Sequence, residues 1–484
     1  MLNLKALLIA LCIFAVTAAT AISQTAPPAP GPSKPVSIPA VQEQKLDNGL
    51  TVAVVERKNL PLVTIQLLVK NGAASEDASK AGLADVTASM LTKGTKTRTA
   101  TQIAEDIEFL GGSINSGAGW NSSFVSVTVT SDKVDQAMAI LSDVVLNPKF
   151  DPKELDLLKS QALDGLTYNL KQPSFLANYV ASRYSFGEHP AGGTPASIQS
   201  LTIADISDFH SSAYVPDSSV LIFSGDISPE KATSISGQVF AKWERVGPPL
   251  PTRKGTWLPQ MGNKLPNRML VIDLPKSGQA AVSYYGQIRN MGLRKSPSYY
   301  PGTVMNTVLG GGYSARLNYE IRIKRGLSYG AGSSIGWRFN QGNFATRAQT
   351  KNLSAAEVAE LTLAEIKRLT DSPVGVDELV PRKSTLTGNF GRNLETTTGL
   401  ASAIGDLYSF GIPTSELNSY VSKVNGVTDA QIREFAGANI LGGDIIIVGD
   451  YAVFKDDLEK RFPGVKIDVI KADDLDLTKD DLRK

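Results

Sequence analysis

Two stretches of this chain of 484 residues read as copies of each other. The segment LIFSGD, which ends at Asp226, recurs as IIIVGD, which ends at Asp450. Just upstream, LTIADISDF, ending at Phe209, parallels VTDAQIREF, ending at Phe435, and a gap of two residues reconciles the two alignments. Two matches in the same order indicate a duplication. We therefore expect two similar halves.

Stretches rich in proline mark the borders of these halves. Residues 24–41 are rich in Pro, Ala and Ser, and residues 246–266 are rich in Pro and Gly, so we expect both to be linkers. The halves then span residues 42–245 and 267–471. Residues 472–484 are expected to form a charged, solvated tail, since the acidic run lacks the glycine of a calcium loop.

Within each half, apolar strands precede amphipathic helices. Strand patterns occupy residues 51–55, 63–69, 125–129, 269–272, 281–288 and 343–349. Helical spacing occupies residues 102–110, 134–145, 299–309 and 314–324, and Ser354 with Glu357 has the spacing of a capping box that opens a further helix. This order predicts an α+β fold of two homologous halves, each a mainly antiparallel sheet with helices packed on one face.

The N-terminus has the pattern of an export signal. Lys5 precedes an apolar run over residues 6–19, and Ala21-Ile22-Ser23 gives a small-x-small site ahead of Gln24. The run is shorter than the roughly 20 apolar residues that a spanning helix needs, and no later segment reaches that length. Residues 1–23 are therefore expected to be a cleaved signal peptide, with an uncleaved anchor as the alternative. The mature chain is expected to be soluble, and periplasmic or secreted.

Composition excludes several classes of function. The only cysteine, Cys12, lies inside the expected signal, so the mature chain has no thiol for disulfides, metal ligation or nucleophilic catalysis. Lys and Arg number 49 against 47 Asp and Glu, so no overall field attracts nucleic acid or anionic lipid.

Residues 82–95 carry the motif that most directly bears on function. They read GLADVTASMLTKGT, which resembles the signature GLAHxxEHMLxKGT of the pitrilysin/insulinase-type zinc peptidase family. In that family the two histidines bind zinc and the glutamate activates a zinc-bound water. At those positions this chain has Asp85, Ala88 and Ser89. The resemblance therefore implies a chain that binds no metal and cleaves no peptide alone.

The resemblance extends over nearly the whole mature chain. Similar strings occur at residues 111–115, 188–193, 214–216 and 223–226. The chain has only two histidines, His189 and His210, and for each a structural or loop role is expected instead of metal ligation.

In the second half, residues 309–317 and 321–329 resemble the C-terminal domain of the family. There an arginine and a tyrosine seven residues apart bind the substrate backbone opposite the zinc, and Arg322 and Tyr329 have that spacing. The alternative is a solvated helix residue and a strand cap. The glycines at 310–312 are expected to stop a helix and not to cradle a phosphate, because no GK[ST] follows them.

A serine motif in the second half resembles a catalytic motif but lacks its context. Residues 332–336 read GSSIG and fit the G-x-S-x-G nucleophile elbow. That elbow needs a following helix and a later histidine, whereas strand and loop are expected here and both histidines come earlier.

Some members of the family work as pairs, in which one subunit carries the zinc motif and the other the Arg/Tyr site. The resemblance thus implies the non-metal-binding subunit of an exported zinc metalloendopeptidase. It would close the chamber and bind a peptide or unfolded polypeptide for a zinc-binding paralogue, with the zinc in that partner and no cofactor here. The alternative is a catalytically inactive homodimer that serves as a peptide-binding or structural scaffold.

Overall fold

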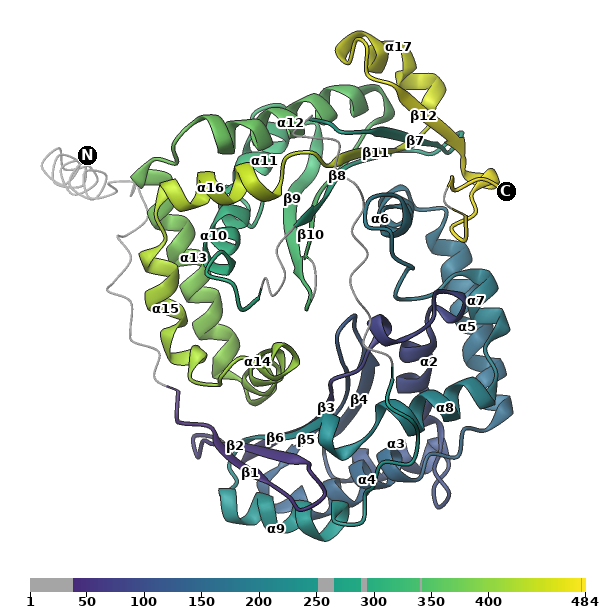
Figure 1. Ribbon diagram of the computed structural model, residues 1–484, viewed down its shortest axis with the longest axis vertical. Coiled ribbons are helices and arrows are strands. Elements are labelled where there is room, and N and C mark those ends of the chain that lie inside the picture. Colours follow the sequence, from purple (N-terminus) through teal and green to yellow (C-terminus); the bar gives the residue numbers. More distant parts are fainter. Residues whose placement is uncertain (1–37, 251–264, 289–293, 340–341, 480) are drawn as a thin grey trace, which may run out of the picture. The chain divides into compact units, whose positions relative to one another are not determined.

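The computed structural model describes residues 38–250, 265–288, 294–339, 342–479 and 481–484. The expected signal peptide, residues 24–37 of the first linker and residues 251–264 of the second linker lie outside the described residues. From Ile38 to Lys484 the chain forms one unit (Figure 1). Within the described ranges, no helix combines the length and apolar character needed to cross a membrane.

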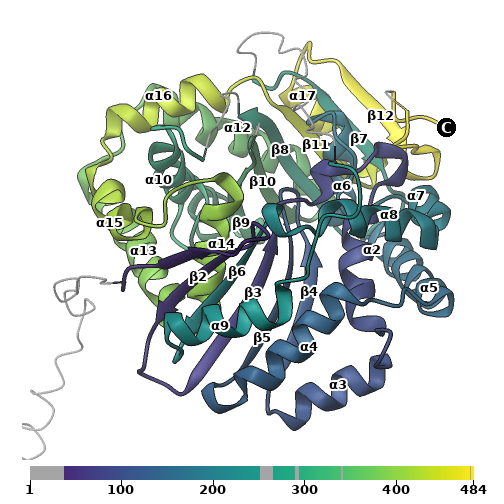
Figure 2. The ribbon, with the colours of Figure 1, turned by 60° about the horizontal axis from the view of Figure 1, so that its bottom comes forward.

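The N-terminal half builds a six-stranded sheet in the order β1-β2-β6-β3-β5-β4 (Figure 2). Its strands are β1 (Gln42–Lys45), β2 (Thr51–Glu56), β3 (Leu62–Val69), β4 (Ser113–Ala118), β5 (Ser123–Thr130) and β6 (Ser219–Gly225). Neighbouring strands are antiparallel except β2 and β6, which are parallel. In the centre, Ile65 lies opposite Phe223 on one side and Val127 on the other.

The C-terminal half repeats this arrangement in the order β12-β7-β11-β8-β10-β9. Its strands are β7 (Met269–Asp273), β8 (Ala280–Ile288), β9 (Ser328–Trp337), β10 (Gly342–Thr350), β11 (Asp444–Gly449) and β12 (Ile467–Lys471). The pairs β7–β11 and β7–β12 are parallel and the rest are antiparallel. The predicted fold class is therefore confirmed.

The duplication inferred from the two repeated segments is visible in both sheets. Strands β6 and β11, which carry these segments, are third in their sheets. The helices that precede them, α8 (Ile203–Ala213) and α16 (Asp429–Asn439), both begin with a capping box, on Thr202 and on Thr428. The edge strands differ, because β1 joins antiparallel from the start of the chain and β12 joins parallel from its end.

The remaining helices mostly cover the sheet of their own half. In the N-terminal half these are α2 (Leu83–Met90), α3 (Ala100–Phe109), α4 (Val134–Leu146), α5 (Pro152–Asn169), α6 (Pro173–Tyr184), α7 (Pro195–Ser200) and α9 (Pro229–Phe240). In the C-terminal half they are α10 (Tyr299–Leu309), α11 (Arg316–Asn318), α12 (Ala355–Asp371), α13 (Val376–Glu395), α14 (Thr397–Phe410), α15 (Glu416–Gly426) and α17 (Tyr451–Arg461). Along β5, Val125, Val127 and Val129 face the core, which also contains the apolar side of α4.

Two helices cross to the other half, so both faces of each sheet are covered. Helix α6 packs on β8 and β11, and its counterpart α14 packs on β3 and β6 (Figure 1). Leu176 and Val180 of α6 thereby share an apolar cluster with Ile446. The physical cause is that the central strands are apolar on both faces, and every residue of β6, β8 and β11 is buried. The prediction of helices on one face only is corrected in this respect.

Two local predictions in the second half need correction. A helix is present within the expected residues 314–324, but it consists of short α11 followed at once by a π-helical turn, Tyr319–Ile323. The capping box at Ser354 does not form, because a 3₁₀ turn, Asn352–Ser354, precedes α12. This turn leaves Ser354 at φ −101° and ψ 1° instead of the extended conformation that a capping side chain needs.

The C-terminal segment is packed, contrary to the expectation of a solvated tail. Leu482 is 1% exposed, and Leu475 and Leu477 pack against the same cluster as α6. Leu475 also forms a β-bridge with Arg483. The leucines lie between acidic residues and bury against the sheet while the carboxylates stay at the surface, so the overall charge of the segment hides its apolar side.

Candidate functional site

The degenerate zinc motif lies on α2 and leaves one side of that helix open. Six of the eight residues of α2 are buried, and the other two are Asp85 and Ser89, one helical turn apart. Ala88, which stands where the family has its general base, is 0% exposed. The positions of the two lost ligands therefore share one accessible face, and the position of the lost base is sealed in the core.

Asp85 and Ser89 do not make a zinc site by their chemistry. Desolvation raises the pKa of the Asp85 carboxyl group, against the opposing effect of a hydrogen bond with the backbone of Ala118. Zinc in proteins is usually held by three or four ligands, drawn from imidazole, thiolate and carboxylate groups. Among the described residues, no group of three or more His, Cys, Asp or Glu side chains could hold a metal ion.

The N-terminal flank of the motif has a structural role. Gly82 precedes α2 at φ 92°, which favours glycine, and a Cβ there would lie 3.2 Å from the Cα of Gly193. The buried carboxylate of Glu76 accepts hydrogen bonds from the amides of Gly82 at 2.8 Å and Ala84 at 2.7 Å. Glu76 thus accepts hydrogen bonds from amides that have no partner within the helix. Its negative charge also interacts favourably with the positive end of the helix dipole.

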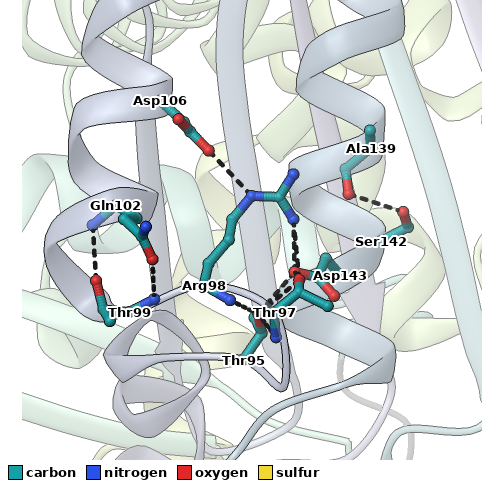
Figure 3. Close-up of polar contacts among 9 residues, drawn as sticks. All are labelled: Thr95, Thr97, Arg98, Thr99, Gln102, Asp106, Ala139, Ser142 and Asp143. Carbon is teal, nitrogen blue, oxygen red and sulfur yellow. Dashed lines mark hydrogen bonds and ion pairs between the residues drawn. The ribbon is translucent and has the colours of Figure 1, made fainter.

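The C-terminal flank of the motif is also structural (Figure 3). The Thr95 hydroxyl donates to the carboxylate of Asp143 at 2.7 Å, Thr97 donates at 2.8 Å, and Arg98 pairs with it at 2.6 Å. Asp143 lies on α4, so this network fastens the turn after α2 to the next layer of helices. Both flanks hold the fold together, which explains why they can match the family signature when its catalytic centre does not.

His210 has a structural role, as predicted. Its Nε2 donates to the carbonyl of Val145 at 2.9 Å, and its ring stacks on Tyr214 with centroids 4.9 Å apart. Burial lowers its pKa to about 4, although the bond to Val145 acts in the opposite direction.

His189 is also buried, 7% exposed, in the loop after α6. Its Nδ1 lies 3.5 Å from the carboxylate of Glu76, and its ring centroid lies 5.2 Å from that of Trp120. The expected loop or structural role of this histidine is confirmed, because its partner is the carboxylate that caps α2.

Arg322 and Tyr329 stand on consecutive elements of the second half. Arg322 lies in the π-helical turn, a rare geometry that often marks functional sites. The turn then closes with the amide of Gly326 donating to the carbonyl of Arg322 and the amide of Leu327 donating to that of Ile321, each at 2.9 Å. The bond from Gly326 to Arg322 is that of an αL cap, and Gly326 has the required φ of 66°. It returns the chain so that Tyr329 enters β9 directly.

The two side chains are available to a ligand to different degrees. Tyr329 is 89% exposed, and no described residue hydrogen-bonds its hydroxyl. Arg322 is half-buried, and its guanidinium carbon lies 5.0 Å from the ring centre of Tyr313. A tyrosine so exposed has no packing role in the described chain, so its aromatic ring is free to contact another molecule.

The glycines before this turn end α10 and then press against β9. Gly310 follows the last residue of α10, and its carbonyl accepts the amide of Ser333 at 3.1 Å. A Cβ on Gly310 would lie 2.1 Å from the Ser333 nitrogen, so only glycine fits. The predicted helix stop is confirmed. Ser334 lies inside β9, not at a turn between a strand and a helix, so the rejection of a nucleophile elbow is confirmed too.

Arg322 lines a pocket of about 710 Å³ together with the glycines at 310–312 and part of β9. The pocket contains a second arginine that the sequence did not single out, Arg347 of β10. The alternation along β10 could have indicated it, since Phe344 and Ala348 are buried in the core while Arg347 points to the other face.

Family comparisons agree with this geometry. The model described as Insulinase (Peptidase family M16) matches residues 51–182, and the model described as Peptidase M16 inactive domain matches residues 200–386. The chain belongs to this insulinase/pitrilysin-type peptidase family, as the resemblance implied.

The relatives include uncharacterized zinc proteases and a non-peptidase homolog. An uncharacterized zinc protease of Rickettsia felis is 26% identical over 390 residues, which cover 78% of this chain and 91% of that protein. The non-peptidase homolog YmxG of Helicobacter pylori is 23% identical over 411 residues, which cover 83% and 91%.

Solved structures share the fold. A peptidase M16 inactive domain from Pseudomonas fluorescens superposes with a TM-score of 0.75 at 26% identity and covers 84% of this chain and 98% of that one. A protease from Helicobacter pylori superposes with a TM-score of 0.78 at 18% identity, covering 85% and 100%.

Proposed function

We propose that this chain is the non-metal-binding subunit of an exported zinc metalloendopeptidase. It binds peptide or unfolded polypeptide through Arg322 and Tyr329 and presents it to the zinc of a paralogous partner. The chemistry at the metal belongs to the partner, which would supply the zinc ligands and the general base. This chain contributes orientation of the scissile bond.

One observation carries the proposal. The helix with the family motif keeps its structural flanks and its open face, but it offers Asp85 and Ser89 in place of ligands and a buried Ala88 in place of the base. Arg322 and the 89% exposed Tyr329 meanwhile remain accessible on the π turn and β9. The catalytic half of the reaction is missing here and the substrate-binding half is retained.

The two side chains suit this task. A guanidinium presents a rigid fork of donors to peptide carbonyls, and a tyrosine hydroxyl can donate to a carbonyl oxygen that gains negative charge. The location proposed for this chemistry is the periplasm or the medium, from Lys5, the apolar run and the small residues before Gln24.

The test is reconstitution. The mature chain would be purified from its source, and its companions would be identified by mass spectrometry. It would then be co-expressed with a paralogue from the same source that carries HxxEH. We expect a zinc-containing complex that cleaves an unfolded polypeptide, whereas this chain alone cleaves nothing and holds no stoichiometric zinc. A partner whose motif glutamate is changed to glutamine serves as the inactive control.

Two outcomes would contradict the proposal. If the chain purifies only with copies of itself and no HxxEH paralogue stimulates or requires it, the inactive homodimeric scaffold is the better description. If the isolated chain holds one zinc and hydrolyses peptide in a chelator-sensitive way, the proposed division of labour is wrong. Export is tested separately, by sequencing the N-terminus of the native protein, which should begin near Gln24.

A further inference from the structure

The charged side chains that line the pocket beside Arg322 are both arginines. It is lined by Arg322 and Arg347, by Ser174 at the start of α6 and by Gln349 of β10, with a floor of glycines. Among the described residues that line it, none is Asp or Glu. Two guanidinium groups therefore meet one hollow without a carboxylate to neutralise them.

Neither arginine is engaged elsewhere in the part of the chain that the structure describes. No described residue forms an ion pair or hydrogen bond with the side chain of Arg322 or Arg347, whereas nearby Arg316 pairs with Glu378 at 2.8 Å. Arg322 lies near the ring of Tyr313, which orients a cation without neutralising it. The Nη2 atom of Arg347 lies above Gly332, and a Cβ added to that glycine would be 4.0 Å from it. Because glycine has no side chain, nothing at this position covers the guanidinium group.

Backbone dipoles add to the positive charge. Helix α6 begins at this pocket with Pro173, and the side chain of its capping residue Gln172 makes no cap hydrogen bond. The uncapped positive end of the helix lies beside Ser174, whose hydroxyl is 3.5 Å from Gln349. Because α6 comes from the other half of the chain, this contribution exists only in the assembled fold.

We infer that this pocket binds a carboxylate group of the peptide, either an acidic side chain or the C-terminal carboxylate. The inference rests on the proposed function and adds a substrate class to it. A carboxylate accepts bidentate hydrogen bonds from guanidinium, and such charge-assisted pairs are the strong ones.

The experiment uses the full mature chain and peptides of Gly, Ala and Ser labelled with an uncharged fluorophore that has no carboxylate. One pair carries Glu or Gln at a single central position with an amidated C-terminus. In a second pair both peptides carry Gln at the central position, and one has a free C-terminus while the other has an amidated C-terminus. Fluorescence anisotropy gives Kd for wild type, Arg347→Gln, Arg347→Lys and Lys455→Gln, the last removing an exposed charge on α17 that lies outside the pocket.

We expect the wild type to bind one carboxylate peptide about tenfold more tightly than its neutral match, a margin that Arg347→Gln abolishes and Lys455→Gln preserves. Arg347→Lys should restore only part of it, because an ammonium group lacks the planar fork. The pair that shows the margin identifies the source of the carboxylate. Added salt should reduce the margin and leave neutral peptides unaffected.

Failure of this inference and failure of the proposed function give different results. If all four peptides bind equally, and Tyr329→Phe weakens all of them alike, the chain binds peptide backbone and the carboxylate site is wrong. If only carboxylate peptides bind and Tyr329→Phe changes nothing, the pocket is real and the backbone-binding role fails. If no peptide binds, or Lys455→Gln abolishes the margin as Arg347→Gln does, the carboxylate site is refuted. Thermal unfolding of each variant verifies that it is folded.

Discussion

The hydroxyl oxygens of Thr64 and Thr397 lie 2.8 Å apart although 333 residues separate them along the chain. Thr64 is completely buried in the middle of β3, where it also meets Thr128 at 2.9 Å. Thr397 is the first residue of α14, the helix of the second half that packs on the sheet of the first half. The buried Thr64 hydroxyl thus has partners on both sides, so the helix can lie on the sheet without leaving this polar group unpaired.

The close packing of α14 on the sheet predicts the effect of replacing Gly405 by a larger residue. A Cβ there would lie 3.1 Å from Nε2 of Gln66 and 3.5 Å from Cδ1 of Ile222. Gly405→Leu should therefore push the helix off the sheet and destabilise the protein by about 1–3 kcal/mol. Gly437→Leu on α16, where an added Cβ meets nothing within 4 Å, is the control and should not destabilise. Denaturant unfolding measures both, and equal stability of the two variants would show that α14 is not tightly seated.

The network on Asp143 predicts an acid-sensitive fold. Burial pushes the pKa of Asp143 upward, but hydrogen bonds from Thr95, Thr97 and Arg98 outweigh it and hold the pKa below its usual value. The stabilisation is therefore present at neutral pH and is lost as the pH falls below about 4. Asp143→Asn should cost about 2 kcal/mol at pH 7 and much less near pH 3. Exposed Asp164→Asn should change little at either pH in the same unfolding assay.

As the pH is lowered, His210 should begin to destabilise the protein at a higher pH than the carboxylates do. Its pKa is lowered to about 4 in the fold by burial, so between about pH 6.5 and 4 the unfolded chain binds a proton that the folded chain does not. Lowering the pH through this window favours unfolding. His210→Gln, which keeps a donor for the Val145 carbonyl, should reduce the loss of stability between pH 7 and 4.5 by about 2 kcal/mol. An unchanged pH profile would mean that this ring does not stay neutral.

Restoring the glutamate of the family motif should harm this fold. Ala88 is 0% exposed, so Ala88→Glu buries a carboxyl group without a partner and should cost at least about 2 kcal/mol. Ser89→His, at a partly exposed position, should be tolerated. Ala452→Glu on the exposed side of α17 is the matched control for adding a carboxylate. If Ala88→Glu melts at the wild-type temperature, the core behind α2 is looser than the structure indicates.

The Arg/Tyr site predicts a loss of activity without a loss of pairing. In the reconstituted enzyme, Tyr329→Phe should lower kcat by about 10²–10³-fold, the usual cost of one preorganised donor to an oxyanion. Arg322→Ala should also slow the enzyme, and a loss confined to KM would indicate uniform peptide binding. Tyr168→Phe, at an exposed tyrosine of α5, is the control. Size exclusion should show intact complexes, and wild-type constants for both site variants would favour the scaffold alternative.

The sequence by itself determined the duplication, six of the twelve described strands and five of the helices, because burial leaves a period of two or 3.6 along the chain. The alternation of Val125, Val127 and Val129 predicted a strand that the structure confirms. The replacement of both ligands and the base at Asp85, Ala88 and Ser89 was also readable, since it concerns residue types at known spacing.

Only the tertiary structure decided which surfaces meet. Periodicity reports that a face is buried but does not say what covers it, so the exchange of α6 and α14 between the halves left no local signal. For the same reason the sequence did not predict the burial of Leu482, because the residues around it are charged. In the pocket with Arg322, the pairing of β9 with β10 sets Arg347 opposite Gly332, and α6 brings Ser174 from the other half of the chain. Local chemistry selects the elements, whereas contacts between distant segments select their neighbours.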